Sequence, residues 1–504
     1  MSAAAASTNV PLRIGRPDEF ASVRNFFQQS SFDDVTLCRL LGMDDMSDLG
    51  RVQWDEINMD TWQASLRWCV QVFVRGLPAS GKESRRACGD AVFAAFQSLG
   101  LLRPAKKDTT SVLCPVWVYP ADGFIVVSDR RDDPDGDPYN PPEDVVFPAI
   151  YAGTLRFLRL LPQDGAGEAL DLCGGSGIGA LRLSRSASVA ATADLTERSA
   201  FFAEFNGRLN NASVTSLCGD LYTPVAGRQF DLITAHPPFV PATGPNMVYR
   251  DGGDTGEEVT RRIIEGLPAH LRKGGTCVIL CVARDTKEKT FEQRAYDWLG
   301  AAASEFDVVF GLEKVLSVDG VVESMRKRGQ QIAVEEAQEL SRRLRSLGTH
   351  QFVYGALVLR RCTEAGVQPP LRVHLSPGGS AEDFQRLLAW RSHCRKPGFR
   401  KWLITSRPRF SPELELTARH TVQDRALVPA EFVFSIQGGI PAALRPDPWV
   451  VPLIARIEGN RSVEEIFEAA RSADELPQGF TLDAFADLVR GMIERRFLAV
   501  DLQP

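Results

Sequence analysis

Short apolar runs alternate with helical patterns through the middle of the chain. Strand-like runs lie at 168–172, 188–193, 213–217, 230–234 and 276–282, and two more follow at 307–310 and 352–359. Amphipathic patterns of helical period lie between them, for example at 197–210 and 257–271. Because strands that alternate with helices form mostly parallel sheets, this pattern predicts an α/β domain at 145–362 with a doubly wound, seven-stranded sheet.

The two flanks have different patterns. Residues 1–144 begin with helical patterns, continue with a β-hairpin that turns at 120–123, and end in a stretch rich in Pro and Asp that indicates a linker. This predicts a helical, winged-helix-like domain whose apolar hairpin packs against the next domain. Residues 363–504 show a hairpin-like alternation at 413–435, and then helices, one of them capped by Ser462. They predict a small α+β domain that resembles a winged-helix module in pattern.

A cluster of small residues follows the run at 168–172. It reads Gly174-Gly175-Ser176-Gly177-Ile178-Gly179, and a helical pattern begins at Ala180. Glycine permits positive φ and a close approach of the backbone to a ligand, and a helix N-terminus presents unpaired N–H groups. Asp194 stands where a dinucleotide fold has its ribose-binding acid. On these residues alone, NAD and other adenosine-containing ligands fit equally well.

Three further features narrow the choice of cofactor. Asp171 lies on the strand before the glycines, where it can order the loop and meet a cationic ligand. Asp220 ends the third strand-like run and is suited to hydrogen-bond an adenine amino group. The fourth run ends in His236-Pro237-Pro238-Phe239. In doubly wound sheets ligands bind at the carboxyl ends of the strands, which is where all three features lie.

Together these motifs resemble the class I S-adenosylmethionine-dependent methyltransferases, which have a Rossmann-like fold. Within that class the nearest likeness is to the methyltransferase small domain group, which includes the HemK-like glutamine methyltransferases. The resemblance covers roughly residues 150–362 and implies S-adenosylmethionine as cofactor and S-adenosylhomocysteine as product. It implies that the cofactor is bound by Asp171, Cys173, Gly174, Gly175, Gly177, Asp194, Leu195, Asp220 and His236.

Within this set the resemblance assigns separate roles. The glycine turn would hold the methionine moiety, Asp194 the ribose hydroxyls and Asp220 the adenine. Asp194 has an alternative role as the N-cap of the helix that follows it. Cys173 is expected to pack under the turn rather than to react.

The residue at the start of the Pro-Pro turn departs from the family pattern. Relatives carry Asn or Asp there, which accepts a hydrogen bond from the nitrogen that is methylated, whereas this chain has His236. A neutral imidazole has an acceptor nitrogen and can also take a proton, so His236 is predicted as an acceptor or a general base. This departure puts glutamine and adenine methylation in doubt. The alternative is a histidine that hydrogen-bonds backbone and only shapes the turn.

The rest of this turn and the loop after it are predicted to contact the substrate. Pro237 and Pro238 fix the backbone, and Phe239 is expected to stack on the substrate or to cover the cofactor. In the loop, Tyr249 and Arg250 are the candidates, with Arg250 meeting a substrate carboxylate or pairing with Asp251 or Asp254. The charge-mixed pattern at 326–348 predicts one long helix, either solvated or covering the substrate side.

Composition adds expectations about partners, metal sites and cellular compartment. The net charge of −6 and the absence of a basic stripe make a nucleic-acid partner unexpected. The ten cysteines are scattered and the six histidines have no metal-ligand spacing, so a reducing, cytoplasmic setting without a metal site is expected. No signal peptide or membrane-spanning run is visible.

The sequence therefore predicts an S-adenosylmethionine-dependent methyltransferase that acts on N or O of a small molecule, such as a natural-product intermediate. The alternative is N-methylation of a protein or RNA, with the flanking domains as recognition modules. A non-catalytic binding module and an NAD-dependent dehydrogenase are the other classes considered. The motif at 236–239 has no role in a dehydrogenase. A homodimer remains open.

Overall fold

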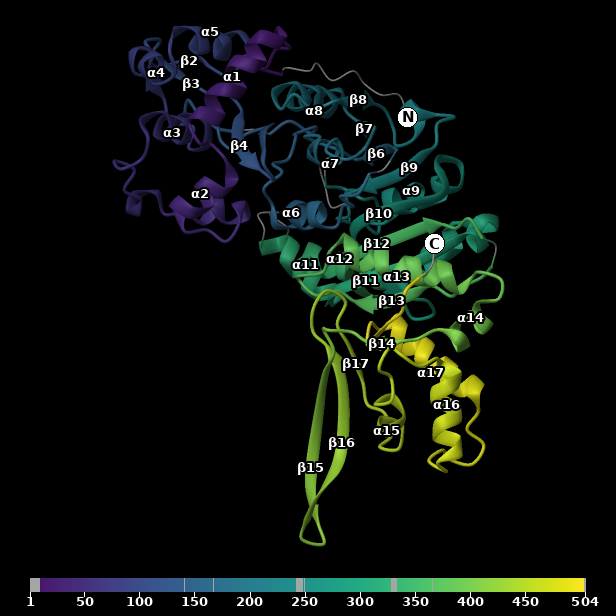
Figure 1. The fold of residues 1–504 in the computed structure, drawn as a ribbon. Coiled ribbons are helices and arrows are strands. Elements are labelled where there is room, and N and C mark those ends of the chain that lie inside the picture. The colour runs from purple at the N-terminus through teal and green to yellow at the C-terminus, as the bar shows by residue number, and fades with distance from the viewer. Residues whose placement is uncertain are drawn as a thin grey trace. The chain divides into compact units, whose positions relative to one another are not determined.

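The computed structural model describes residues 10–139, 141–165, 167–241, 248, 250–327, 333–364 and 366–502. The chain divides into two compact units, one made of Met1–Gly300 with Leu316–Tyr354 and the other of Ala301–Val315 with Gly355–Pro504. Figure 1 shows the elements of both. The division into three domains at residues 144 and 362 stays a prediction. Within the described residues, no helix has the length and apolar character that crossing a membrane requires.

The first unit begins with helices α1 (Pro17–Gln29), α2 (Asp34–Leu41), α3 (Ala64–Cys69), α4 (Gly81–Cys88) and α5 (Asp90–Ser98). A small sheet of β1 (Ala79–Ser80), β3 (Ser111–Leu113) and β2 (Arg103–Pro104) accompanies them, and β4 (Trp117–Ala121) and β5 (Phe124–Ser128) form the predicted hairpin. The sequence pattern predicts one helix at 84–99, but Gly89 takes φ +80° and separates α4 from α5. The pattern at 61–75 also predicts one helix, and the structure has α3 there, followed by a π-helical turn at Val70–Val74.

The main sheet has eight strands rather than the predicted seven. They are β6 (Glu168–Leu172), β7 (Val189–Asp194), β8 (Val214–Cys218), β9 (Phe230–Ala235), β10 (Leu271–Thr286), β11 (Phe306–Leu316), β12 (Thr349–Arg361) and β13 (Leu371–His374), in the order β13-β11-β12-β10-β9-β6-β7-β8. All seven predicted strands occur. The additional strand, β13, is four residues long and follows two prolines, so its pattern was too short to recognise. It runs parallel to β11.

Helix α6 (Ala152–Arg159) precedes β6. The helices between the strands are α7 (Ile178–Leu183), α8 (Glu197–Leu209), α9 (Glu258–His270), α10 (Phe291–Trp298), α11 (Val318–Lys327) and α12 (Val334–Ser346). The strand order reverses at β6, because β7 and β8 lie on one side of it and β9 and β10 on the other. Such a reversal is where ligands of open α/β sheets bind. The helix predicted at 326–348 is shorter than expected: α12 covers Val334–Ser346, and Lys327 is the last residue of the preceding helix, α11.

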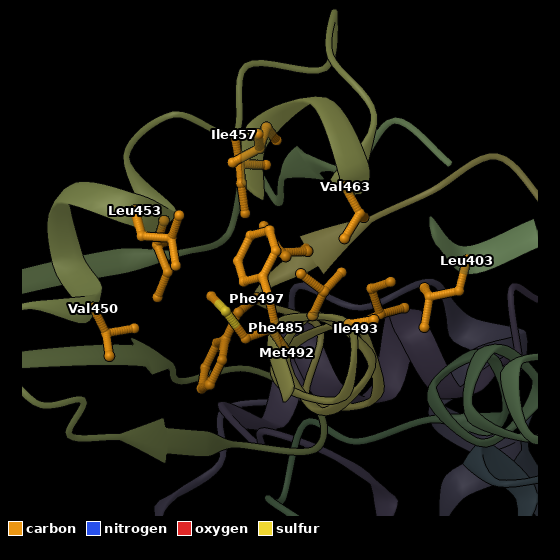
Figure 2. Packing of buried hydrophobic residues seen from close by; sticks show 14 of the residues in the cluster. Leu403, Val450, Leu453, Ile457, Val463, Phe485, Met492, Ile493 and Phe497 are labelled. Atoms are coloured by element: carbon orange, nitrogen blue, oxygen red, sulfur yellow. The ribbon is translucent and has the colours of Figure 1, made fainter. Parts of the chain in front are cut away.

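The second unit contains the C-terminal elements: α13 (Ala381–Cys394), α14 (Phe399–Thr405), β14 (Arg409–Phe410), β15 (Glu415–Gln423), β16 (Ala426–Ile436), β17 (Ala442–Leu444), α15 (Val450–Ile454), α16 (Val463–Ser472), α17 (Leu482–Glu494) and β18 (Leu498–Ala499). The predicted hairpin is β15–β16, and Ser462 caps α16 as expected. Figure 2 shows the apolar core of this unit, where Phe485, Met492 and Phe497 lie among side chains of α14, α15 and α16.

Candidate functional site

The ends of three neighbouring parallel strands lie at one level of the sheet. Leu172 of β6 pairs with Ala193 of β7 on one side and with Ala235 of β9 on the other. The chain therefore leaves β6 into the glycine turn, β7 at Asp194 and β9 at His236, all along the same sheet edge. The expectation that these motifs share an edge is thus met by the register of the strands.

The glycine turn needs glycine for two different reasons. Gly175 and Gly177 take φ of +53° and +79°. At three positions an added Cβ would also collide with a neighbour: Gly174 with Thr192 Oγ1 at 1.8 Å, Gly177 with Ala203 Cβ at 2.8 Å and Gly179 with Asp171 Oδ2 at 2.4 Å. At Gly175 an added Cβ would meet nothing within 4 Å. The turn is thus packed on its inner side and open at Gly175, where a ligand can approach the backbone.

Asp171 lies beneath the turn. Its side chain accepts a hydrogen bond from Thr234 Oγ1 at 2.7 Å, and the residue is 2% exposed. Burial raises the pKa of this carboxyl to about 7, with the charge of Asp194 adding to the effect. This position supports the expectation that Asp171 orders the loop and leaves little surface for direct contact with a cationic ligand.

Asp194 connects the glycine turn to the start of α8. Its carboxylate accepts from the N–H of Gly175 at 2.9 Å and from the N–H of Thr196 at 3.3 Å. The alternative role of Asp194 as N-cap is wrong, because Thr196 caps α8 by accepting from the N–H of Ser199. The next side chain, Leu195, is 56% exposed. A carboxylate beside an exposed apolar side chain suits the hydroxyls and the flat base of a nucleoside.

Asp220 follows β8 and lies half exposed. Arg262 of α9 donates to Asp220 Oδ2 at 2.7 Å. The sequence pattern did not predict this contact. Nothing tests the adenine contact predicted for Asp220. At the end of β6, Cys173 has φ +58°, and burial raises the pKa of its thiol well above the ordinary value, which agrees with an unreactive packing role.

These residues fit an adenosyl cofactor by their chemistry. The turn is open at Gly175, a carboxylate stands next to it, and Leu195 leaves apolar surface at the same edge. Beneath the turn, Thr192 Oγ1 is buried without a hydrogen-bond partner and occupies the place that a side chain at residue 174 would need. The cradle therefore exists only with glycine at this position.

His236 lies between aromatic rings. Its imidazole stacks on Phe157 of α6, with 5.5 Å between centroids, and lies 6.0 Å from the ring of Phe239. Gly153, one turn earlier on α6, also faces the imidazole: an added Cβ would stand 3.7 Å from its Cε1, in ordinary van der Waals contact. Neither Phe157 nor Gly153 was predicted, because the amphipathic pattern of α6 does not indicate which strand end it faces.

Burial lowers the pKa of His236 to about 4. The imidazole is therefore neutral near pH 7 and offers one acceptor nitrogen, but it is a weak base. Among the residues that the structure describes, no hydrogen bond holds the imidazole, so the alternative of a backbone-bonded shaping histidine finds no support. The geometry favours acceptor over general base.

Residues 250–252 are hydrogen-bonded to Val240, which directly follows the Pro-Pro turn. The N–H of Val240 donates to Arg250 O at 3.0 Å, and the N–H of Gly252 donates to Val240 O at 2.9 Å. Arg250 Nε donates to Asp251 Oδ1 at 2.9 Å, so the ion pair foreseen as the alternative for Arg250 is present. Tyr249 lies outside the described residues. Nothing tests the substrate contacts predicted for Pro237, Pro238 and Arg250.

The helices α11 and α12 are tied to this same loop. Val240 packs against their apolar cluster of Val318, Val322, Met325, Leu340, Leu344 and Phe352. Arg343 of α12 pairs with Asp254. These contacts place α11 and α12 beside the loop and not free in solvent along their whole length. Within the described ranges no three His, Cys, Asp or Glu side chains are grouped to hold a metal ion.

Comparison with known proteins shows which family this part of the chain resembles. Residues 148–297 match the family model described as "Methyltransferase small domain". The chain is 30% identical over 200 residues to the ribosomal protein uL3 glutamine methyltransferase of Bradyrhizobium diazoefficiens, a match that covers 34% of this chain and 62% of that protein. It is 36% identical over 72 residues to the release factor glutamine methyltransferase of Xylella fastidiosa strain Temecula1, covering 12% of this chain and 26% of that protein.

The chain thus spans less than two thirds of the length of either relative. Among solved structures, the ribosomal protein L11 methylase of Lactobacillus delbrueckii subsp. bulgaricus aligns with 16% identity and a TM-score of 0.23, over 42% of this chain and 77% of that one. The family match and the relatives agree with the motifs at the sheet edge. Residues 148–297 are thus similar to the methyltransferase small domain family, in agreement with the S-adenosylmethionine site that the motifs predict.

Proposed function

We propose that this chain transfers a methyl group from S-adenosylmethionine to an amide nitrogen of a protein side chain. The observation that carries the proposal is the turn His236–Phe239, which follows β9 directly beside the glycine turn that follows β6. The bound cofactor would supply the methyl group: its sulfur–methyl bond would break as the nitrogen–methyl bond forms, S-adenosylhomocysteine would leave, and the amide nitrogen would release one proton to solvent. Asp194 and Leu195 would hold its nucleoside, and the open backbone at Gly175 would hold its amino-acid part.

The neutral imidazole of His236 defines what the acceptor must offer. With a pKa of about 4, it accepts a hydrogen bond from an N–H but does not remove a proton from an ammonium group, whose ordinary pKa is about 10.4. Methyl transfer needs the nucleophile aimed in line with the sulfur–methyl bond. His236 would therefore orient the acceptor nitrogen as the Asn or Asp of related enzymes does. This argues for an amide and against a lysine amine.

The comparisons favour a protein acceptor over a small molecule. The named relatives methylate glutamine in ribosomal protein uL3 and in release factors. The doubt that His236 raised about glutamine rested on its action as a base, and the low pKa removes that reason. The small-molecule acceptor, the first expectation from the sequence, has no such relative among these matches.

Transfer of tritium from methyl-labelled S-adenosylmethionine tests the proposal. The purified chain is incubated with protein from cells that lack its gene, and the products are divided into a small-molecule filtrate and fractions treated with protease or ribonuclease. We expect label in protease-sensitive material, and we expect acid hydrolysis to release it as methylamine, the product of an N-methyl amide. Asp194→Ala serves as the control that lacks the carboxylate beside the turn.

Three results would overturn the proposal. Label in the filtrate would restore the small-molecule acceptor, and ribonuclease-sensitive label would indicate RNA. Label that stays on lysine after acid hydrolysis would contradict the amide and the acceptor role of His236.

A further inference from the structure

Among the residues that the structure describes, no strand lies along one edge of β5. It pairs with β4 alone, in a two-stranded sheet. On the other edge, Asn210 accepts from the N–H of Ile125 at 2.8 Å and donates to its carbonyl at 2.7 Å. Asn206 does the same at Val127, with distances of 2.8 and 2.9 Å. Two amide side chains of α8 thus take the place of a neighbouring strand.

The two asparagines fit this strand edge because the residue spacing along a helix matches the residue spacing along a strand. Residues four apart on a helix are about 6 Å apart along its axis, and residues two apart on a strand are about 6.6 Å apart. Asn206 and Asn210 are four apart, and Ile125 and Val127 are two apart. An amide presents a donor and an acceptor side by side, as a backbone peptide does across a ladder. The arrangement satisfies four backbone groups that would otherwise be left unpaired.

Asn206, unlike Asn210, also forms a hydrogen bond to the cofactor turn. Its Nδ2 also donates to the carbonyl of Ser176 at 2.9 Å, between Gly175 and Gly177, and the residue is fully buried. Asn210 uses its second N–H within α8, on the carbonyl of Asn206. The glycine turn is therefore bonded through one side chain to the hairpin that precedes the methyltransferase region.

A second contact ties the hairpin to the helix after the turn. Asp122, at the tip between β4 and β5, accepts from Arg182 of α7 at 2.6 Å. The hairpin thus contacts α7, which follows the glycine turn, and α8, which packs against the turn at Gly177. Together with the Asn206 contact, this places the hairpin among the supports of the turn.

We propose that Asn206 is a positioning residue for the cofactor turn, and that the hairpin β4–β5 belongs to the cofactor site and not to a separate recognition module. This rests on the proposed function in one respect, that the turn at 174–179 binds the cofactor. Asn206 fixes the carbonyl of Ser176 from below, and its own position is fixed by the edge of β5. The backbone of the turn is then held in one orientation before ligand arrives.

The test compares Asn206→Ala with Asn210→Ala in the full chain. Each variant loses two bonds to β5, but only the first loses the bond to the turn. Calorimetric titration with S-adenosylhomocysteine measures affinity, and thermal unfolding measures stability. We expect Asn206→Ala to raise Kd about tenfold, which corresponds to about 1.4 kcal/mol. Asn210→Ala should stay within about twofold despite a similar loss of stability.

A second variant covers the case in which Asn206→Ala does not fold. Asn206→Asp keeps the acceptor for the N–H of Val127 but presents a carboxylate to the carbonyl of Ser176, and should weaken binding at least as much. Equal loss of affinity in the Asn206 and Asn210 variants, or no loss in either, overturns the inference. Wild-type protein that does not bind S-adenosylhomocysteine would instead contradict the proposed cofactor, so the two failures are distinguishable.

Discussion

Two turns end neighbouring strands of the same sheet, and they are held very differently. The turn after β6 is fixed from several directions: Thr192 and Asp171 lie against its glycines, Asp194 accepts from Gly175, and Asn206 holds Ser176. The turn after β9 is fixed by prolines and ring contacts, and within the described residues no hydrogen bond reaches its imidazole. The first turn is specified by its own scaffold, whereas the second leaves its polar group available.

This difference explains why the sequence predicts the cofactor more readily than it predicts the methyl acceptor. A turn that tolerates only glycine at several positions leaves a pattern in the sequence, and that pattern indicates the class of ligand. A turn with one available imidazole defines only the kind of hydrogen bond that an acceptor must make. The following changes test whether the contrast is real.

The largest effect is expected from Gly174→Ala. The added Cβ would stand 1.8 Å from Thr192 Oγ1, so the turn must shift. We expect a loss of about 1–3 kcal/mol in stability and about a hundredfold or greater loss of S-adenosylhomocysteine affinity, measured by thermal unfolding and calorimetry. Thr192→Ala alone should cost little, since this hydroxyl has no partner, and the double variant should recover part of the affinity. No recovery would show that the collision is not the cause.

A smaller effect is expected at the second turn. His236→Ala removes the acceptor and should lower kcat about tenfold, the value of roughly one hydrogen bond, with S-adenosylhomocysteine affinity unchanged within about twofold. His236→Asn restores an acceptor and should remain within about threefold of wild type. An asparagine variant as slow as the alanine variant would contradict the acceptor role, and two fully active variants would make the imidazole dispensable.

The smallest effect concerns pH. Because burial lowers the folded-state pKa of His236 from 6.5 to about 4, the unfolded chain binds more protons between these values. This residue therefore reduces stability as pH falls from about 6.5 towards 4 and has little effect above that window. The ring resonances of His236, assigned by their loss in His236→Asn, should not titrate between pH 5 and pH 8. A midpoint near 6.5 would instead return the imidazole to the role of a base.

Much of the fold was predictable because the signals were local. The seven strands and the glycine turn each follow from a few consecutive residues, and Gly42 and Ser462 end or begin helices as their types indicate. The gap at Gly89 and the short β13 were missed because the first depends on one φ angle and the second on a partner strand.

The supports of the site could not be predicted in the same way. Arg262 meets Asp220, and Phe157 meets His236, across separations that no local pattern encodes. The spacing of Asn206 and Asn210 was readable as two amides on one helical face. Their partner was not, because an amide fits any free strand edge. Asp194 as an N-cap failed for a simpler reason, that Thr196 stands two residues later with the same capacity.

The hydrogen bonds of Asn206 and Asn210 to β5 also have a consequence for how the chain is made. These bonds join residues 79 and 85 positions apart in sequence. During synthesis β4 and β5 emerge long before α8, so the outer edge of β5 stays open until residue 210 has left the ribosome. An open strand edge is a template for pairing with other chains. The N-terminal hairpin is thus exposed to misassembly during synthesis, and a nascent chain stopped before residue 206 still has this edge open.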